Sequence, residues 1–320
     1  MAAASYSTYL ARRVILTVVS IFIIISFNFL LFRVLPGNPI TLLYRSPRLT
    51  LNQEKALSIE FGLNRPEWVQ YILYVKNALE GNFGISYYYK VSVTSKIIPA
   101  LENSLILLIP ATIISILLGI YTGVFSAWRE NTKADVAVLQ TAMAFYAMPT
   151  FWLGGIFILI AIYIGGIPVA GEYSVGSTSI INLMEHMALP LLTLVLVYYG
   201  QFTIMMRNSL RDVLSEDYIL TAYAKGADSK RILYSHAVPN AMLPMISLIA
   251  INLGLMVTGA ILVETVFSWP GIGYLIYQSI GHLDYPMLQG AFIIVTFSVV
   301  LANLLADIIY GLVDPRIRYR

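Results

Sequence analysis

The sequence predicts an all-α integral membrane protein with six transmembrane helices. Its 320 residues are 58% hydrophobic and 12% charged, whereas about one quarter of a soluble protein is charged. Apolar runs recur along the chain at lengths near the ~20 residues that a helix needs to cross the hydrocarbon core. Lysine and arginine gather in alternate connecting segments, which is the pattern of a multi-pass protein that follows the positive-inside rule.

The first predicted span covers residues 14–35 and follows Arg12 and Arg13. A cleaved signal peptide is the alternative, but its apolar region is about 7–15 residues long and ends at a small-residue cleavage site. The run in this chain is longer, and it ends in the sequence RVLPGNP, which offers no such site. We therefore expect residues 1–35 to form a cytoplasmic N-terminus and a permanent first transmembrane helix.

Residues 36–100 are polar and mixed, and we expect them to form an extracytoplasmic segment. The sequence PGNP directly after the first span ends that helix. Short helices are expected at 54–61 and 66–79, followed by a turn at 80–84. The segment has too little apolar material to fold as a domain of its own.

Five further spans predict a transmembrane core over residues 101–320. Proline is tolerated in membrane helices where neighbouring groups satisfy the freed backbone. Kinks are therefore expected at Pro110, Pro149 and Pro244, whereas Pro190 and Pro239 fit the ends of spans. The five spans are expected at 101–127, 136–164, 187–206, 239–265 and 287–312.

The distribution of lysine and arginine predicts that both termini lie in the cytoplasm. The loops at 165–186 and 266–286 contain neither residue, so the positive-inside rule places them outside. The long loop at 207–239 then lies in the cytoplasm, between the fourth and fifth spans. The inner segments contain Arg12, Arg13, Arg129, Lys133, Arg207, Arg211, Lys225, Lys230, Arg231, Arg316, Arg318 and Arg320.

The cytoplasmic loop is expected to form two short helices joined at Gly226. Ser215 is a candidate N-cap, and acidic residues follow it in the first turn, where they complement the helix dipole. Gly226 is placed for the left-handed conformation that ends many helices. Asp228 is expected to cap a second helix at 229–237, and Pro239 suits the first turn of the fifth span.

Two interpretations of this loop remain open from its residues alone. It could be an amphipathic helix resting on lipid, or a docking surface for a soluble partner. Its charge is mixed, with Glu216, Asp217 and Asp228 set against Lys225, Lys230 and Arg231. A lipid-binding helix would be more strongly basic, so the composition favours docking.

The same loop resembles the Glu-Ala-Ala…Gly…Ile-x-Leu-Pro signature of ABC importer permeases. Leu220-Thr221-Ala222 stands in place of Glu-Ala-Ala, and Pro239 follows Gly226 by thirteen residues. His236 and Val238 replace the Ile and Leu of the signature. The stretch TAYAKGADSKRILYSHAVPNAMLP is similar to the variant found in the dipeptide/oligopeptide type of permease.

Further stretches along nearly the whole chain resemble the same subfamily, whose members are binding-protein-dependent transport components of the inner membrane. RRVILTVVSIFIIISFNFLLFRVLPGNP is similar to its first span, and FGLNRPEWVQY and EGNFGIS to its external segment. MPTFWLG is similar to its third span. VETVFSWPGIGYL, DYPMLQG and LADIIYGLVDPRIR are similar to its last two spans.

This resemblance implies a fold like that of a type I ABC importer permease and a multi-subunit machine. The expected partners are a homologous second permease subunit, two cytoplasmic ATPase subunits and an extracytoplasmic solute-binding protein. ATP and Mg²⁺ are expected on the ATPases, with no cofactor on this chain, and each ATPase would receive one coupling helix. The coupling residues implied are Leu220, Thr221, Ala222, Tyr223, Ala224, Lys225, Gly226, Ala227 and Pro239.

The implied activity is import of di- and oligopeptides by alternating access in the cell membrane. Oligosaccharides or nickel are alternative substrates of the same machine. A stand-alone channel or secondary transporter is the alternative from a different class. An enzyme is not expected, because the chain lacks GxxxxGK[ST], HExxH and GxSxG motifs and any cysteine, and has three scattered histidines. No metal site and no nucleic-acid partner are expected.

Polar residues within the spans are the candidates for the pathway or gate, because ionisable and polar groups are costly in a membrane. Glu264 is expected either to bond the turn that follows it or to act in gating. Asp307, with Asn303 on the same face, is expected to link helices more often than to line a pathway. The remaining candidates are Tyr198, Gln201, Asn252 and Thr258.

Overall fold

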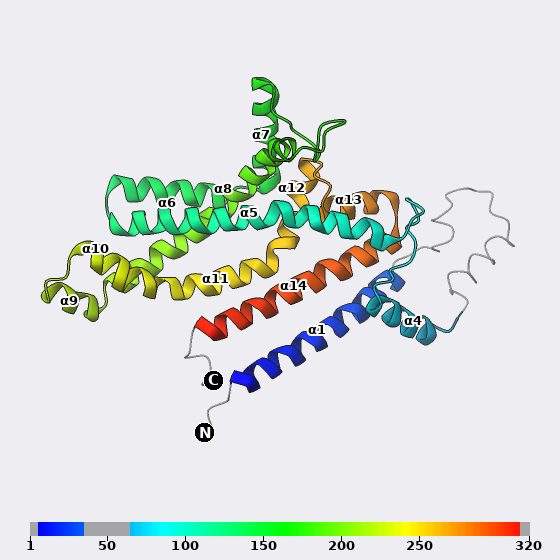
Figure 1. The fold of residues 1–320 in the computed structure, drawn as a ribbon, viewed down its shortest axis with the longest axis horizontal. Coiled ribbons are helices and arrows are strands. Elements are labelled where there is room, and N and C mark those ends of the chain that lie inside the picture. The colour runs from blue at the N-terminus through cyan, green and yellow to red at the C-terminus, as the bar shows by residue number, and fades with distance from the viewer. Residues whose placement is uncertain (1–5, 35–64, 314–320) are drawn as a thin grey trace.

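The computed structural model describes residues 6–34 and 65–313, and this part of the chain is helical apart from its connecting loops and one isolated β-bridge. Figure 1 shows long helices that run side by side, with α9 and α10 at one end and α13 near the other. The helices are α1 (Tyr6–Val34), α4 (Glu67–Leu79), α5 (Val93–Trp128), α6 (Lys133–Tyr146), α7 (Thr150–Ile164), α8 (Ile180–Leu214), α9 (Asp217–Ala224), α10 (Ser229–Arg231), the π-helix η1 (Ile232–Ala237), α11 (Val238–Gly259), α12 (Ile261–Val266), α13 (Ile272–His282) and α14 (Tyr285–Val313).

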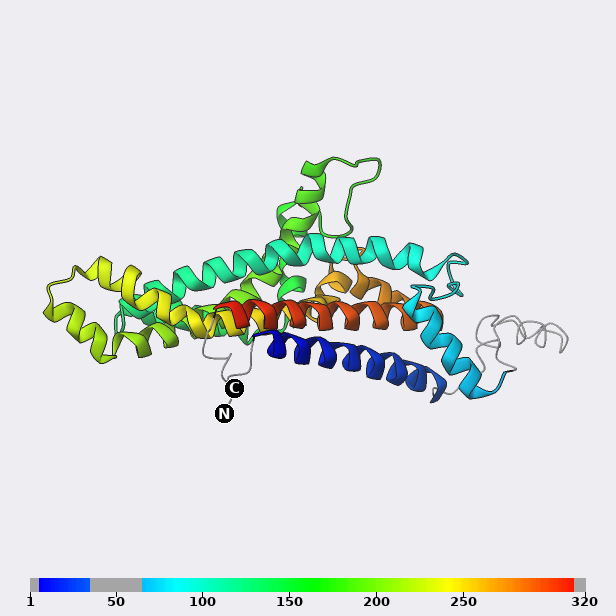
Figure 2. The same ribbon diagram turned by 60° about the horizontal axis from the view of Figure 1, so that its bottom comes forward.

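Five helices of the described residues are long and apolar enough to cross a membrane, and a sixth span results if the bent pair α6 and α7 is one crossing. This agrees with the predicted number. Helix α5 packs along α8, and α14 packs against both α11 and α1. The two ribbon views show α1 alongside α14 at the edge of the bundle (Figures 1 and 2). The expected helix at 54–61 lies outside the described residues.

The predicted third span is not one straight helix. Helices α6 and α7 meet at an angle of 100° across a short break. The break ends at Pro149, which is the N-cap of α7. Proline disfavours helical geometry in the residue before it, so α6 cannot continue into α7 along the same axis. By contrast, Pro99, Pro110, Pro190 and Pro244 lie inside continuous helices.

The fourth span is longer than predicted. Helix α8 has 35 residues and contains Pro190, so that proline does not mark the end of the span. The prediction relied on the apolar run, and the helix extends beyond that run at both ends. The added turns at the C-terminal end bring α8 directly to α9.

The fifth span also differs from the prediction at both ends. The expected short helix at 229–237 is not separate, because α10 and η1 run directly into α11. The amide of Val238 donates to the carbonyl of Leu233, five residues back. This wider turn immediately precedes Pro239, whose ring would otherwise crowd the preceding turn. At the other end the helix is interrupted at Ala260, which is the N-cap of the next helix, α12.

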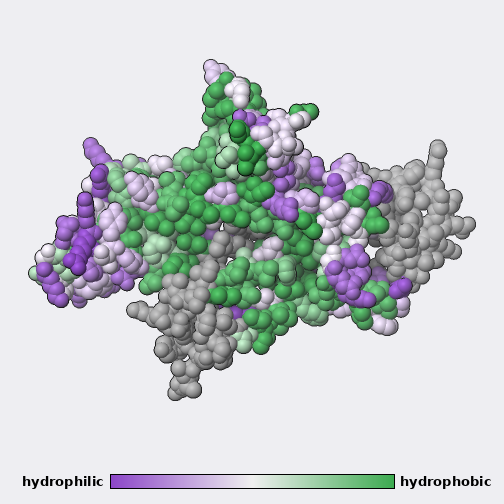
Figure 3. All heavy atoms as spheres, in the orientation of Figure 1, coloured by the Kyte–Doolittle hydropathy of each residue, from purple (hydrophilic) through white to green (hydrophobic). Residues whose placement is uncertain are grey.

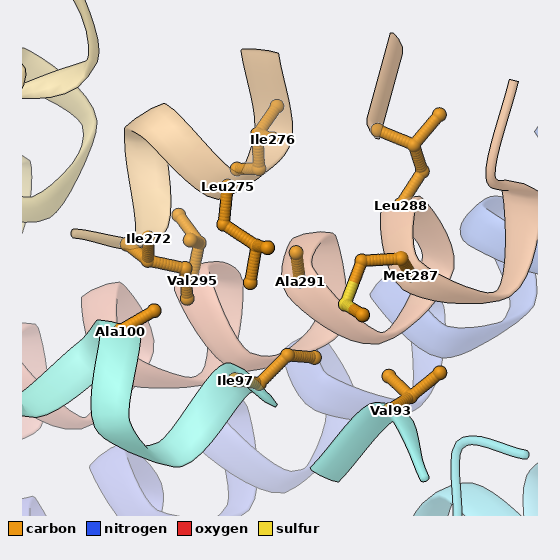
Figure 4. Packing of buried hydrophobic residues seen from close by; sticks show 10 residues of the cluster. All are labelled: Val93, Ile97, Ala100, Ile272, Leu275, Ile276, Met287, Leu288, Ala291 and Val295. Atoms are coloured by element: carbon orange, nitrogen blue, oxygen red, sulfur yellow. The ribbon is translucent and has the colours of Figure 1, made fainter. Parts of the chain in front are cut away.

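Buried apolar side chains form three clusters along the bundle. Figure 4 shows the cluster between α5, α13 and α14, where Ile97, Leu275 and Met287 point toward one another. A second cluster surrounds Trp269. The third cluster packs α9 against α8, η1 and α11 and contains Leu210, Ile219, Ile232 and Ala241. In Figure 3 apolar residues cover the middle of the visible surface, and polar residues gather over α9 and α10 and around α4. This distribution suits a protein that lies in a bilayer.

Candidate functional site

The loop between α8 and α11 begins at a different residue from the one predicted. Ser215 is the C-cap of α8, and its hydroxyl donates to the carbonyl of Asp212 at 2.6 Å. The N-cap of α9 is Glu216, which makes no side-chain capping bond. The predicted N-cap role of Ser215 is therefore wrong, because α8 continues further than its apolar pattern indicates.

Helix α9 ends at Gly226 as predicted, in a left-handed conformation with φ of 77°. The amide of Gly226 donates to Tyr223 at 2.9 Å, and that of Ala227 donates to Ala222 at 3.1 Å. This pair of bonds is the Schellman motif, which satisfies the last carbonyls of a helix. The predicted capping by Asp228 is also present, since its carboxylate accepts the amide of Lys230 at 3.3 Å.

A buried side chain fixes α9 to the rest of the bundle. Ile219 is fully buried against residues of α8, η1 and α11, among them Leu210, Ile232 and Ala241. Tyr218 and Tyr223 on the same helix are exposed. Their hydroxyl groups allow the rings to face water, whereas Ile219 has no such group.

The residues implied to couple lie mostly on the outer surface of the loop. Leu220 is 61% exposed and Tyr223 is 46% exposed. Within the group, Ala222 and Ala227 face the third cluster and are half-buried. The exposed members are Leu220, Thr221, Tyr223, Ala224, Lys225, Gly226 and Pro239.

The helix that leads into the loop is held by a buried ion pair. Arg207 of α8 donates through Nε to Oδ1 of Asp135 and through Nη2 to Oδ2, each at 2.7 Å. Asp135 also accepts bonds from the hydroxyl of Ser126 and, at 3.2 Å, from the amide of Asn131. From the sequence, Arg207 was predicted only to help set the membrane orientation, and Asp135 was not among the predicted site residues. A lone aspartate beside Lys133 gave no signal of a partner 72 residues away.

Close helix packing adds to this support. A Cβ atom placed on Gly123 of α5 would come within 2.6 Å of the Met206 Cβ on α8. The hydroxyls of Thr122 and Thr203 share a hydrogen bond of 2.8 Å across the same interface. Ser209 donates to the carbonyl of Ala241, 2.8 Å away on α11. Small residues allow membrane helices to approach this closely.

Glu264 is fully buried near the opposite end of the bundle. Its carboxylate accepts the hydroxyl of Ser104 at 2.6 Å and the amides of Gly273 and Tyr274 at 2.7 and 3.2 Å. These amides belong to the first turn of α13, so Glu264 supplies the acceptor that this helix start needs. Ser104 in turn accepts the amide of Ile272 at 2.8 Å. The geometry is the one expected for bonding to the following turn.

A second buried carboxylate at this end of the bundle is not among the residues predicted from the sequence. Asp284 is buried between α13 and α14. It accepts bonds from the hydroxyl of Ser86 and from the amides of Tyr87 and Tyr88 at 3.0 and 3.3 Å. Asp284 thereby ties the segment before α5 to the segment before α14. A single aspartate before Tyr-Pro was a possible signal of a helix N-cap.

The other predicted pathway residues do not gather into one site. Asn252 bonds the carbonyl of Leu248 in its own helix at 2.9 Å. Asp307 pairs with Arg13 of α1 at 2.8 Å, which links two helices as expected, while Asn303 is exposed. Tyr198 and Gln201 are half-buried on α8. The side chain of Thr258 lies outside the described residues.

A bundle of membrane-length helices with an exposed, firmly based helical loop defines a multi-pass membrane protein. The chain belongs to the family described as the binding-protein-dependent transport system inner membrane component, whose family model matches residues 97–319. Among the described residues, no three histidine, aspartate or glutamate side chains group as metal ligands would.

Several named relatives match nearly the whole chain. It is 34% identical over 316 residues to the oligopeptide transport system permease protein AppB of Bacillus subtilis, covering 98% of this chain and all of that one. It is 32% identical over 335 residues to the dipeptide transport system permease protein DppB of Escherichia coli K12, covering 98% and 99%. A probable peptide ABC transporter permease of Sinorhizobium fredii is 36% identical over 312 residues, covering 97% and 99%.

A solved structure supports the fold. An inward-facing conformation of the MetNI methionine ABC transporter contains a chain that matches with a TM-score of 0.56 and 17% identity. The match covers 68% of this chain and 96% of that one. The predicted likeness to a type I importer permease is therefore confirmed at the level of the fold.

Proposed function

We propose that this chain is one permease subunit of an ATP-driven importer for di- and oligopeptides. It forms half of a translocation pathway together with a homologous second permease. An extracytoplasmic binding protein delivers the peptide, and two cytoplasmic ATPases drive alternating access. Both termini and the α9 loop lie in the cytoplasm, and ATP and Mg²⁺ bind the ATPases and not this chain.

The observation that supports this proposal most directly is the construction of the α9 loop. Its outer residues, Leu220, Tyr223 and Lys225 among them, are exposed, while Ile219 beneath them is fully buried. A surface that receives a soluble partner and passes on its movement needs both an accessible face and a firm base. The buried cluster beneath α9 contains side chains of both α8 and α11. A displacement of α9 would therefore be passed to both of these helices.

The mixed charge of the loop argues against a lipid-resting helix. The exposed positions include Glu216, Asp217 and Asp228 as well as Lys225, Lys230 and Arg231. A membrane-surface helix gains affinity from a strongly basic polar face, and this loop has none. Peptide as the substrate rests on the named relatives, which are oligopeptide and dipeptide permeases.

The loop assignment is tested by replacing Gly226 with valine. Valine is strained at φ of 77°, so the Schellman motif should open and α9 should lose its orientation. We expect the ATPase subunits to co-purify less with the variant and uptake to fall. Gly176→Val is the matched control, because Gly176 has φ of 80° and open space but lies in the loop between α7 and α8. Normal ATPase association and uptake by Gly226→Val would refute the assignment.

The substrate is tested in proteoliposomes that contain the second permease and the ATPases, with the binding protein outside. We expect uptake of labelled di- and oligopeptides that stops without ATP. Uptake of an oligosaccharide or of nickel alone would replace the peptide assignment and leave the importer intact. Transport by this chain alone without ATP would instead show a channel or secondary transporter.

A further inference from the structure

Helix α4 presents an apolar stripe that no other described element covers. Trp68, Ile72 and Leu79 are 67%, 55% and 72% exposed. At 100° per residue these positions fall within about 40° of one another around the helix. Gln70 and Asn77 lie on the opposite side. The helix is therefore amphipathic, with its apolar stripe directed away from the protein.

Contacts with α1 fix the depth of α4. The hydroxyls of Tyr71 and Ser26 share a hydrogen bond of 2.7 Å. The ring centres of Tyr71 and Tyr74 each lie 5.4 Å from the ring centre of Phe29. The apolar span of α1 continues to Phe32, six residues past Ser26, which corresponds to about 9 Å of helix. Part of α4 thus lies level with the last turns of a membrane-crossing segment.

The surface of α1 at that level is itself apolar and uncovered. Phe27 is 63% exposed and Leu30 is 56% exposed. Side chains of this kind on a membrane-crossing helix face lipid. The stripe on α4 continues the same apolar surface beyond the end of the span. Figure 2 shows α4 alongside the end of α1, at a steep angle to it.

We propose that α4 binds the lipid bilayer, with Trp68, Ile72 and Leu79 in the boundary between headgroups and acyl chains. Tyr71 and Tyr74 hold the helix against α1, while the opposite side of the helix, with the half-buried Gln70 and the exposed Asn77, is turned toward water. A tryptophan at one end of the stripe suits this position, because its ring combines an apolar body with a polar N–H and is enriched at membrane interfaces. The helix sets the depth of α1 in that leaflet.

Lipid fits this surface better than a soluble protein does. The stripe is short, and three of its large side chains would be exposed to water whenever a transient partner was absent. Lipid, in contrast, would cover the stripe permanently. The bond between Tyr71 and Ser26 places this part of α4 level with the apolar span of α1, where lipid is expected. Amphipathic helices with their apolar face 5–10 Å into the interface are held in this way.

The natural absence of cysteine makes the test direct. Single cysteines are introduced at 68, 72 and 79 on the stripe, and at the matched positions 70 and 77 on the polar face. Each variant is spin-labelled in liposomes without any binding protein. Relaxation by oxygen, which dissolves in lipid, is compared with relaxation by a water-soluble nickel chelate.

We expect the three stripe labels to favour oxygen and the two polar-face labels to favour the chelate, each by at least severalfold. Equal access of the chelate to both faces would overturn the proposal, because the stripe would then face water. Stripe labels that reach neither reagent would also overturn it, since protein would cover them. Co-purification with the second permease shows that each variant is folded, so a negative result is informative.

Discussion

Arg207 of α8 holds both carboxylate oxygens of Asp135 of α6 at 2.7 Å, and both side chains are almost completely buried. The pair lies where α8 leaves the bundle for the exposed loop. Its geometry is bidentate, the strongest arrangement for arginine and a carboxylate. Movement of the C-terminal end of α8 relative to α6 would have to break it.

Replacing Asp135 with asparagine should destabilise the protein. Removing one partner leaves Arg207 as an uncompensated buried charge, at a cost of about 3–5 kcal/mol. We expect a clear fall in the unfolding temperature in detergent. Glu130→Gln is the control, because its pair with Arg211 is much more exposed and such pairs contribute about 0–1 kcal/mol. Equal effects of the two variants would contradict the role of burial.

Replacing Ile219 with alanine should loosen α9. The substitution leaves a cavity in the third cluster, and such changes cost about 2–5 kcal/mol. We expect faster hydrogen exchange at the amides of α9, while the exchange of α5 stays unchanged. Leu220→Ala is the matched control, since that neighbouring side chain is 61% exposed. Unchanged exchange in Ile219→Ala would show that α9 is held by other contacts.

Replacing Gly271 with alanine should disturb the network at Glu264. A Cβ atom at Gly271 would collide with the buried carboxylate, which is held by Ser104 and the start of α13. We expect a destabilisation of about 1–3 kcal/mol, because the N–H groups would lose their acceptor. Gly281→Ala in the same helix meets nothing within 4 Å. It should be neutral or stabilise by up to about 1 kcal/mol.

Stability should fall in strong alkali through Tyr87. Burial, with a smaller contribution from Asp284, raises the pKa of Tyr87 from 10.0 to about 12. Its stabilising contribution is complete below pH 10 and is lost as the pH rises to 12, because the unfolded state loses its proton first. The slope is up to about 1.4 kcal/mol per pH unit. Tyr87→Phe should show a shallower decline between pH 10 and 12, and an unchanged decline would contradict this.

The membrane character, the number of spans and the end of α9 at Gly226 could be predicted from the sequence. Gly226 was identifiable because few residues adopt positive φ, and Asp228 because aspartate is a common cap. The 100° break before Pro149 was only partly predictable. A proline in an apolar run indicates a kink, but the angle depends on how α6 and α7 pack against α8.

The polar networks could not be predicted because their members are far apart in the chain. Asp135 and Arg207 are separated by 72 residues, and Ser104 and Glu264 by 160. Helix α13 was read as a loop for the same reason. Its start depends on Ser104 and Glu264, which belong to other helices, and on no cap of its own.

The bond between Ser86 and Asp284 has a consequence for biosynthesis. The two residues are 198 positions apart, so the turn at 86–88 has no acceptor until the last membrane helix is about to be made. The pocket around Ile219 is likewise completed by residues that follow it, from Ile232 to Met245. During synthesis, therefore, both the turn at 86–88 and the pocket around Ile219 stay incomplete until later residues have been made. A nascent chain stopped before Asp284 would therefore lack the protein acceptor for the amides of Tyr87 and Tyr88.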